Sequence, residues 1–244
     1  MHLPYRVIAI AGFVFSLIFI STSAAVSQSH NRPTTNPTTN RTSDRSTNPT
    51  TNLGGRYSVF GTNPDGGEYT GSLEVMARGG VYQFRWNAGT QYDGVGVRNG
   101  RIVAVAFANG SNGSGCGVVD YTVLNDGTLD GKWGYWGTSA GGTERGRHIS
   151  GRGLEGEYAA TGSNPDGKRY QVNISVQAAG SGYKFTWSNN TEGFGVRLGD
   201  NVAVGIGGER CGFVAYEIKT DGSLDGVWGG YGTERTGTEK ATKQ

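Results

Sequence analysis

The chain has 244 residues, with 44 glycines, 11% aromatic residues, 17% charged residues and a formal net charge of +2. The nearly balanced charge gives no sign of nucleic-acid binding, and glycine without a three-residue period excludes a collagen-like chain. Two cysteines and three histidines, of which His2 and His30 precede the predicted fold, do not make a tetrahedral zinc site. No phosphate-binding glycine motif is present. We therefore expect no nucleic-acid partner, no metal and no cofactor.

Residues 1–27 have the pattern of a signal peptide. Arg6 gives a positive start, residues 7–20 are apolar but too short for a comfortable membrane span, and small residues follow at 23–27. We expect export to the periplasm, the cell envelope or the medium, and a mature protein without a membrane span. The alternative is an N-terminal helix that is retained as an anchor.

Residues 28–54 are predicted to be a disordered linker. The segment repeats Thr-Asn-Pro and has almost no apolar side chain, so it cannot bury enough surface to order itself. We interpret it as an extended spacer.

Two copies of one sequence follow, at residues 55–150 and 151–244. The stretch Cys116–Trp133 parallels Cys211–Trp228, and most of the remaining sequence aligns in the same way. Self-similarity of this kind indicates equivalent structural modules. We predict one module per copy, with the seam at the sequence GRGLEG.

Apolar and polar residues alternate within each copy, as at Tyr82, Phe84 and Trp86. A period of two indicates half-buried strands, and glycine-rich turn signals divide each copy into about eight of them. We predict an all-β fold of two tandem, up-and-down antiparallel β-barrels of about eight strands, similar in outline to avidin and lipocalin barrels. The alternatives are an open sandwich, or two copies that share one sheet across their boundary.

The sequence Asn-Pro-Asp-Gly at 63–66 occurs in both copies and has the chemistry of a turn. Pro64 presets a central turn position, Asp65 can bond the nearby backbone, and Gly66 permits positive φ. The competing interpretation makes Asp65 and its counterpart Asp166 metal ligands or general bases, but no second ligand lies near either in sequence. We predict hairpin turns.

The ordered set of motifs resembles a known family. G-x-Y-x-x-x-G-x-N-P-D-G, Y-x-F-x-W, G-x-G-V-R, D-G-(T/S)-L-D-G-x-W and G-T-E are similar to those of small exported bacterial proteins often labelled fibronectin-binding proteins, and they cover Gly55 to Lys240 once per copy. The resemblance implies export and extracellular attachment. We expect an extracellular protein or a carbohydrate as the class of partner. The shared residues look like turns and core residues.

Tyr135 and Trp136 are the candidate ligand-binding aromatics. Neighbours on a strand face opposite sides, so one of the two is expected to point outward or into a barrel mouth. An exposed aromatic side chain there can stack on a sugar or anchor a partner. The alternative is simple packing at the rim.

Two kinds of carboxylate recur in both copies, at Asp130 and Asp225 and at Glu144 and Glu239. A glycosidase needs two carboxyl groups on opposite sides of one cleft. We favour the structural interpretation, in which the aspartates end strands and the glutamates pair with basic side chains. Arg98 and Arg197 are the basic candidates, and we include them among the predicted ligand-binding residues.

Cys116 and Cys211 occupy equivalent positions in a protein that is expected to be exported. Two equivalent strands that meet across a pseudo-twofold axis would permit one bridge between the copies. Side-by-side barrels would instead leave two separate buried thiols. The second arrangement is slightly favoured.

The sequence as a whole predicts an exported, non-enzymatic binding or attachment protein. Alternatives are a carrier with a small ligand inside each barrel and a structural protein of the envelope or matrix. An enzyme that uses Asp and Glu would require those side chains to converge in one cleft.

Overall fold

The computed structural model describes residues 52–110, 113, 115–232 and 234–244. The predicted signal peptide, and the linker as far as residue 51, lie outside the described residues. Every described element is a strand except one turn of 3-10 helix, η1 (Gly208–Arg210), and none is a helix long and apolar enough to cross a membrane.

The first copy supplies eight strands, of which three have runs of four or five consecutive buried residues instead of the predicted alternating burial. The eight strands are β1 (Gly55–Thr62), β2 (Glu68–Arg78), β3 (Val81–Asn87), β4 (Gln91–Asn99), β5 (Ile102–Asn109), β6 (Gly117–Val123), β7 (Leu129–Tyr135) and β8 (Gly142–Arg152). The second copy supplies β9 (Glu155–Ser163), β10 (Arg169–Ala179), β11 (Gly182–Trp187), β12 (Glu192–Leu198), β13 (Asn201–Ile206), β14 (Gly212–Ile218), β15 (Leu224–Gly229) and β16 (Gly237–Lys243).

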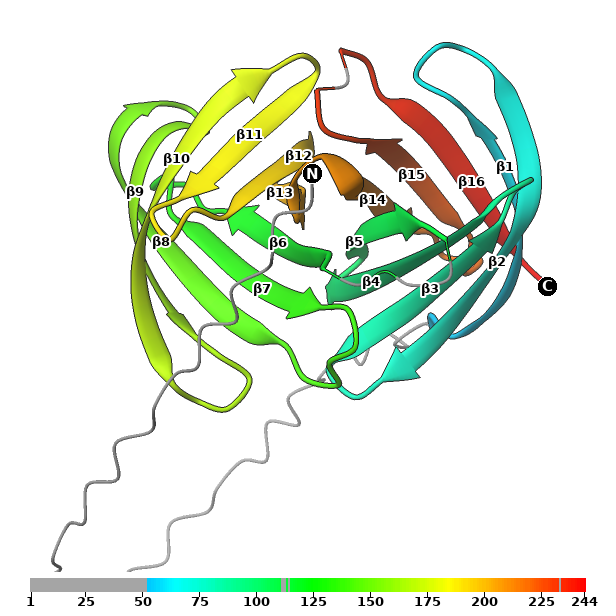
Figure 1. The fold of residues 1–244 in the computed structure, drawn as a ribbon, viewed down its shortest axis with the longest axis horizontal. Coiled ribbons are helices and arrows are strands. Elements are labelled where there is room, and N and C mark those ends of the chain that lie inside the picture. Colours follow the sequence, from blue (N-terminus) through cyan, green and yellow to red (C-terminus); the bar gives the residue numbers. More distant parts are fainter. Residues whose placement is uncertain (1–51, 111–112, 114, 233) are drawn as a thin grey trace, which may run out of the picture. The chain divides into compact units, whose positions relative to one another are not determined.

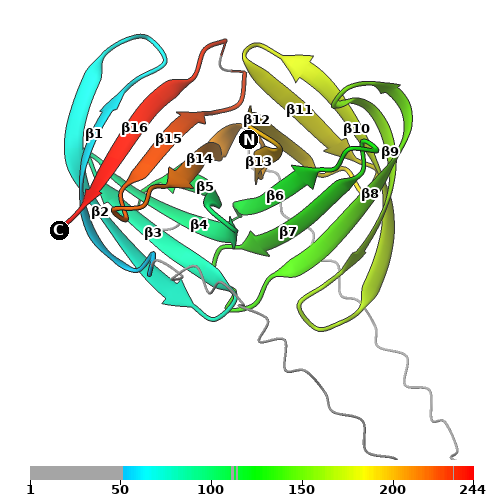
Figure 2. The ribbon, with the colours of Figure 1, turned by 180° about the vertical axis from the view of Figure 1, so that it is seen from behind.

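The strands close into two antiparallel barrels of eight strands each, which confirms the predicted fold class. Barrel 1 consists of β1–β5 together with β14–β16, and barrel 2 consists of β6–β13. Figures 1 and 2 show the cyan and green strands β1–β5 in one barrel with the orange and red strands β14–β16. The two ends of the described chain therefore meet in barrel 1, where β1 pairs with β16.

The barrels do not coincide with the sequence copies, so the prediction that 55–150 and 151–244 each close a barrel is wrong. Each barrel takes five strands from one copy and three from the other, and barrel 2 is inserted between β5 and β14 of barrel 1. β6 and β14 occupy equivalent positions in the two copies. β5 can therefore form with β14 the same antiparallel hydrogen bonds that it would form with β6 in a barrel made of one copy. The chain crosses between the barrels twice, after β5 and after β13.

A disulfide joins Cys116 to Cys211, so the expectation of two separate thiols is wrong. Cys116 lies just before β6 and Cys211 just before β14, so the bond connects the two crossings, with Cα atoms 5.8 Å apart. Around it lies an apolar cluster formed by outer faces of both barrels, and both cysteines belong to it. The crossings are therefore fixed covalently and by packing.

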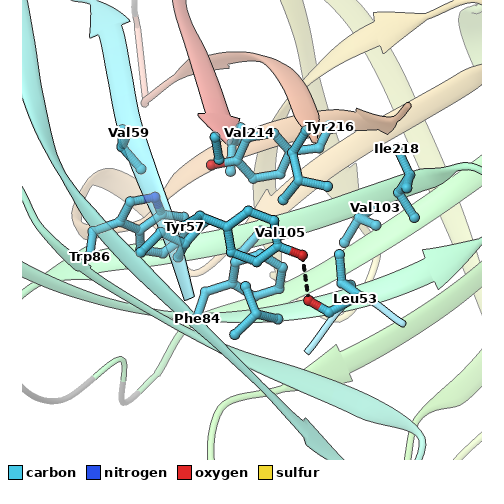
Figure 3. Close-up of a cluster of buried hydrophobic side chains, with 14 residues drawn as sticks. Leu53, Tyr57, Val59, Phe84, Trp86, Val103, Val105, Val214, Tyr216 and Ile218 are labelled. Atoms are coloured by element: carbon cyan, nitrogen blue, oxygen red, sulfur yellow. Dashed lines mark hydrogen bonds between the residues drawn. The ribbon is translucent and has the colours of Figure 1, made fainter. Parts of the chain in front are cut away.

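Each barrel interior is filled at one end. Leu53 precedes β1, is 1% exposed and packs among the core side chains of barrel 1, so the predicted linker ends before this residue rather than at 54. Its carbonyl accepts a hydrogen bond from the Tyr57 hydroxyl at 2.7 Å (Figure 3). Leu154 and Tyr158 repeat the arrangement in barrel 2 at 2.7 Å. We call this the closed end of each barrel.

The Asn-Pro-Asp-Gly turns lie at the opposite end and have the predicted geometry. The Gly66 N–H donates to the Asn63 carbonyl at 2.9 Å, the Asp65 carboxylate accepts from the Gly67 N–H at 3.0 Å, and Gly66 has a φ of 95°. Asp166 has the same role, accepting from the Lys168 N–H at 3.0 Å.

Candidate ligand-binding site

The end of barrel 1 opposite Leu53 is open and holds a cavity of about 230 Å³. Residues at the starts of β2, β4, β14 and β16 and at the ends of β3, β5 and β15 converge there because neighbouring strands run antiparallel. The lining side chains are Asn63, Tyr69, Trp86, Ala88, Tyr92, Phe107, Val214, Tyr216, Trp228 and Glu239. We call this region the mouth of barrel 1.

Glu239 is the centre of a buried hydrogen-bond network in this mouth. Its Oε1 accepts from the Trp86 indole N–H at 2.9 Å and from the Tyr216 hydroxyl. Its Oε2 accepts from the Tyr69 hydroxyl at 2.8 Å. All three donors are neutral, so the prediction that this glutamate pairs with a basic side chain is wrong.

Glycines make room for the tyrosines of this network. A Cβ at Gly226 would lie 2.5 Å from the Tyr216 ring, and a Cβ at Gly61 would collide with the Tyr69 ring. The same relations hold in barrel 2, at Gly131 and Gly162. The glycine of Leu-Asp-Gly and the first glycine of Gly-x-Asn-Pro-Asp-Gly therefore serve the site as well as the strands that carry them.

The buried network shifts the proton affinities of its members. Burial raises the pKa of Glu239, while the hydrogen bonds from Tyr216, Trp86 and Tyr69 oppose that shift. Burial and the nearby Glu239 charge raise the pKa of Tyr69 and of Tyr216 well above the ordinary value. Both phenols therefore stay protonated and continue to donate to the carboxylate.

The mouth of barrel 2 repeats this design around Glu144, with a cavity of about 450 Å³. Oε1 of Glu144 accepts from the Trp187 indole at 3.1 Å and from the Tyr121 hydroxyl. Oε2 accepts from the Tyr170 hydroxyl at 3.0 Å. Each network contains residues of both sequence copies, because each barrel does.

The two mouths differ in their walls. Tyr92 and Phe107 line the mouth of barrel 1, whereas Thr191 and Ile206 take the equivalent positions in barrel 2. Barrel 2 has an additional aromatic side chain, Tyr135, and polar side chains at its rim, including Gln171, Ser188 and Asn189. Barrel 1 therefore has the smaller and more aromatic mouth.

The predicted site residues lie in three different places. Tyr135 lines the mouth of barrel 2, and burial and the Glu144 charge raise its pKa. Trp136 instead packs against the apolar cluster between the barrels. The expectation that one of these neighbours faces a mouth is confirmed, and the binding role remains a prediction.

Arg98 and Arg197 lie at the closed ends of the barrels, away from both glutamates. Arg98 Nε donates to the Gly100 carbonyl at 2.9 Å, and Arg197 Nε donates to the Gly199 carbonyl at 2.8 Å. Both side chains thus cap the turn that follows their own strand. The structure does not bring either of them to Tyr135.

The recurring aspartates take part in exposed ion pairs. Asp130 lies 3.8 Å from Arg145, and Asp225 lies 3.3 Å from Lys219. In the part of the chain that the structure describes, no group of three or more His, Cys, Asp or Glu side chains is placed to hold a metal ion. Among the described residues that line each mouth, one is a carboxylate, Glu239 in barrel 1 and Glu144 in barrel 2.

Sequence reasoning missed the tyrosines that bond the glutamates, although both pairs recur in the two copies. Comparisons of the chain with protein-family models, with curated proteins and with solved structures found no match.

Proposed function

We propose that the protein is an exported, non-enzymatic binding protein that holds a small ligand, or the end group of a larger one, at the mouth of each barrel. The observation that carries this proposal is a cavity lined by aromatic side chains around a buried carboxylate, built twice in one chain. Ligand sites in proteins are concave and mostly apolar, with a few placed polar groups.

A binding role agrees better with the chemistry of the mouths than catalysis does. Hydrolysis by paired carboxylates needs two such groups across one cleft. Glu144 and Glu239 line different mouths, and the hydrogen bonds to each come from neutral side chains. A single carboxylate that is already bonded to three donors is suited to recognition by charge.

Two mouths in one chain also favour an attachment role, which the family resemblance implies, and the partner class is an extracellular protein or a carbohydrate. If both mouths engage end groups of one partner, tethering raises the apparent affinity by about a hundredfold or more. A carrier of two separate small molecules would not benefit from this rise in apparent affinity.

The test is native mass spectrometry of the exported full chain, combined with tryptophan fluorescence. Trp86 and Trp228 line one mouth and Trp133 and Trp187 the other, so four of the five tryptophans report on ligand there. We expect a retained ligand mass, or a fluorescence response to members of a metabolite and glycan library. Arg197→Ala, at a closed end, is the matched control and should respond like the wild type.

The contradicting result is a chain that carries no ligand mass and shows no fluorescence response to any library member. That result would leave the glutamate networks with a structural role only.

A further inference from the structure

We infer that the mouth of barrel 1 selects an organic cation, a quaternary or methylated ammonium group, which sits among its aromatic rings beside Glu239. The inference rests on the proposed binding role of the mouths and specifies the class of ligand for one of them.

The composition of the lining favours a cation over other small ligands. Six aromatic side chains and one carboxylate line the cavity, and its lining among the described residues includes no lysine, arginine or histidine. Aromatic faces carry negative electrostatic potential, and quaternary ammonium groups are recognised by cages of such faces. An anionic ligand would find no positive group to compensate its charge.

Four of the lining rings form one aromatic wall of the cavity, with Phe107 in contact with the other three. The Phe107 ring centroid lies 5.7 Å from that of Trp86, 5.9 Å from that of Tyr92 and 6.1 Å from that of Trp228. The angles between these ring planes are 56°, 88° and 68°. Rings at these distances and angles pack edge to face or tilted against one another, and all four of them line the cavity.

The carboxylate lacks a compensating charge. Trp86, Tyr69 and Tyr216 donate hydrogen bonds to Glu239 but bring no positive charge. The described residues place no ion pair on Glu239, although it is only 7% exposed. A charge in a poorly solvated site interacts more strongly than in water, so a bound cation gains more there.

The size of the cavity limits the ligand to a compact group. Its volume of about 230 Å³ lies below the roughly 300–1,000 Å³ of sites for drug-sized ligands. Barrel 2 has Thr191 and Ile206 in place of two rings of this wall and a wider cavity of about 450 Å³, so it should hold a compact cation less well. The second mouth is thus an internal comparison.

The experiment titrates the exported full chain with choline and with its uncharged carbon isostere, in which carbon replaces the nitrogen. Calorimetry and tryptophan fluorescence are the readouts. We expect choline to bind at least about tenfold more tightly than the isostere, because only the cation gains from the rings and the carboxylate.

Three variants locate the site. Glu239→Gln keeps an acceptor but removes the charge, and we expect it to weaken choline binding by about tenfold or more. Glu144→Gln in barrel 2 is the matched control and should leave the tighter choline site unchanged. Phe107→Ile introduces the residue that barrel 2 has at the equivalent position, Ile206, so the variant is expected to fold. It tests whether the aromatic ring contributes to choline binding even if Glu239→Gln fails to fold.

Equal binding of choline and the isostere would overturn the choice of a cation while leaving the mouth a binding site. Absence of binding by both would also overturn it, and a ligand mass retained by the same preparation would still uphold the proposed function. Choline binding that is insensitive to both Glu239→Gln and Phe107→Ile would place the cation elsewhere and overturn the inference.

Discussion

Trp86 donates its indole N–H to Glu239 at 2.9 Å across a sequence separation of 153 residues. The bond joins the third strand of the first copy to the last strand of the second. Its counterpart, from Trp187 to Glu144 at 3.1 Å, joins the copies in the opposite sense. In this fold neither copy closes a barrel alone, and each glutamate therefore bonds strands from both copies within its barrel.

Glu239→Ala should strongly reduce the free energy of unfolding. The substitution leaves the Trp86 indole and the Tyr69 and Tyr216 hydroxyls without their acceptor, and each buried unsatisfied group costs about 1–3 kcal/mol. We expect a loss of at least about 3 kcal/mol in urea unfolding, and a smaller loss for Glu239→Gln. A loss below about 1 kcal/mol would contradict the network's structural role.

Replacing both Cys116 and Cys211 by alanine should lower the free energy of unfolding by about 2–4 kcal/mol, because the bond closes a loop with a sequence separation of 95. Both barrels should stay folded, because the backbone hydrogen bonds between their strands do not depend on the disulfide. Circular dichroism and urea unfolding, with and without reductant, measure the effect. The variant should be insensitive to reductant, and a collapse of the strand signal would show that the bond is needed for closure.

Asp120 makes stability depend on pH. Its carboxyl is fully buried on the outer face of β6, where burial raises its pKa from 3.8 to about 6, against hydrogen bonds from Asn201 and Asn99. Because the folded-state pKa is raised, the stabilisation from the protonated group is present below about pH 4 and is lost as the pH rises through about 6. The change corresponds to about 3 kcal/mol.

Asp120→Asn removes this titration and keeps an acceptor for Asn201. We expect the variant to be more stable than the wild type at pH 8 and the difference to shrink towards pH 4, in urea unfolding at both values. Ala215→Asp, which places a carboxyl at the equivalent position of the second copy, should destabilise barrel 1 at pH 8. Parallel pH profiles for the wild type and Asp120→Asn would contradict the assignment.

Residues 116–211 should fold without the rest of the chain. This segment contains all eight strands of barrel 2 in sequence order, and the disulfide joins its ends. We expect dispersed amide resonances and a cooperative unfolding transition, together with self-association through the outer face that barrel 1 covers in the full chain. A segment without dispersed resonances would show that barrel 2 needs its neighbour.

The sequence predicts the elements of this fold better than their partners. Alternation at Tyr82, Phe84 and Trp86 and the turn at 63–66 identify strands and hairpins, because both depend on neighbours along the chain. The sequence does not reveal that three strands of each copy complete the barrel of the other copy. β6 and β14 are equivalent in sequence, so β5 could form the same antiparallel pairing with either of them, and in the structure it pairs with β14. The disulfide between Cys116 and Cys211 is not predictable for the same reason, because it depends on where the chain crosses between the barrels.

The candidate site was only partly predictable. Glu144, Glu239 and Tyr135 stood out from the sequence, but pairing of the glutamates with arginines was a wrong prediction. A turn carbonyl two residues along its own chain satisfies Arg197, which sequence spacing alone does not reveal. The bond between Tyr69 and Glu239 spans 170 residues and follows only from closure of the barrel.

The position of the disulfide determines how the chain would carry a mechanical load. Tension applied between the two ends of the chain enters barrel 1 through β1 and β16, which lie side by side. It then reaches Cys116 and passes directly to Cys211, bypassing the intervening residues. Tension between the two ends of the described chain would therefore strain barrel 1 alone, and barrel 2 would keep its shape.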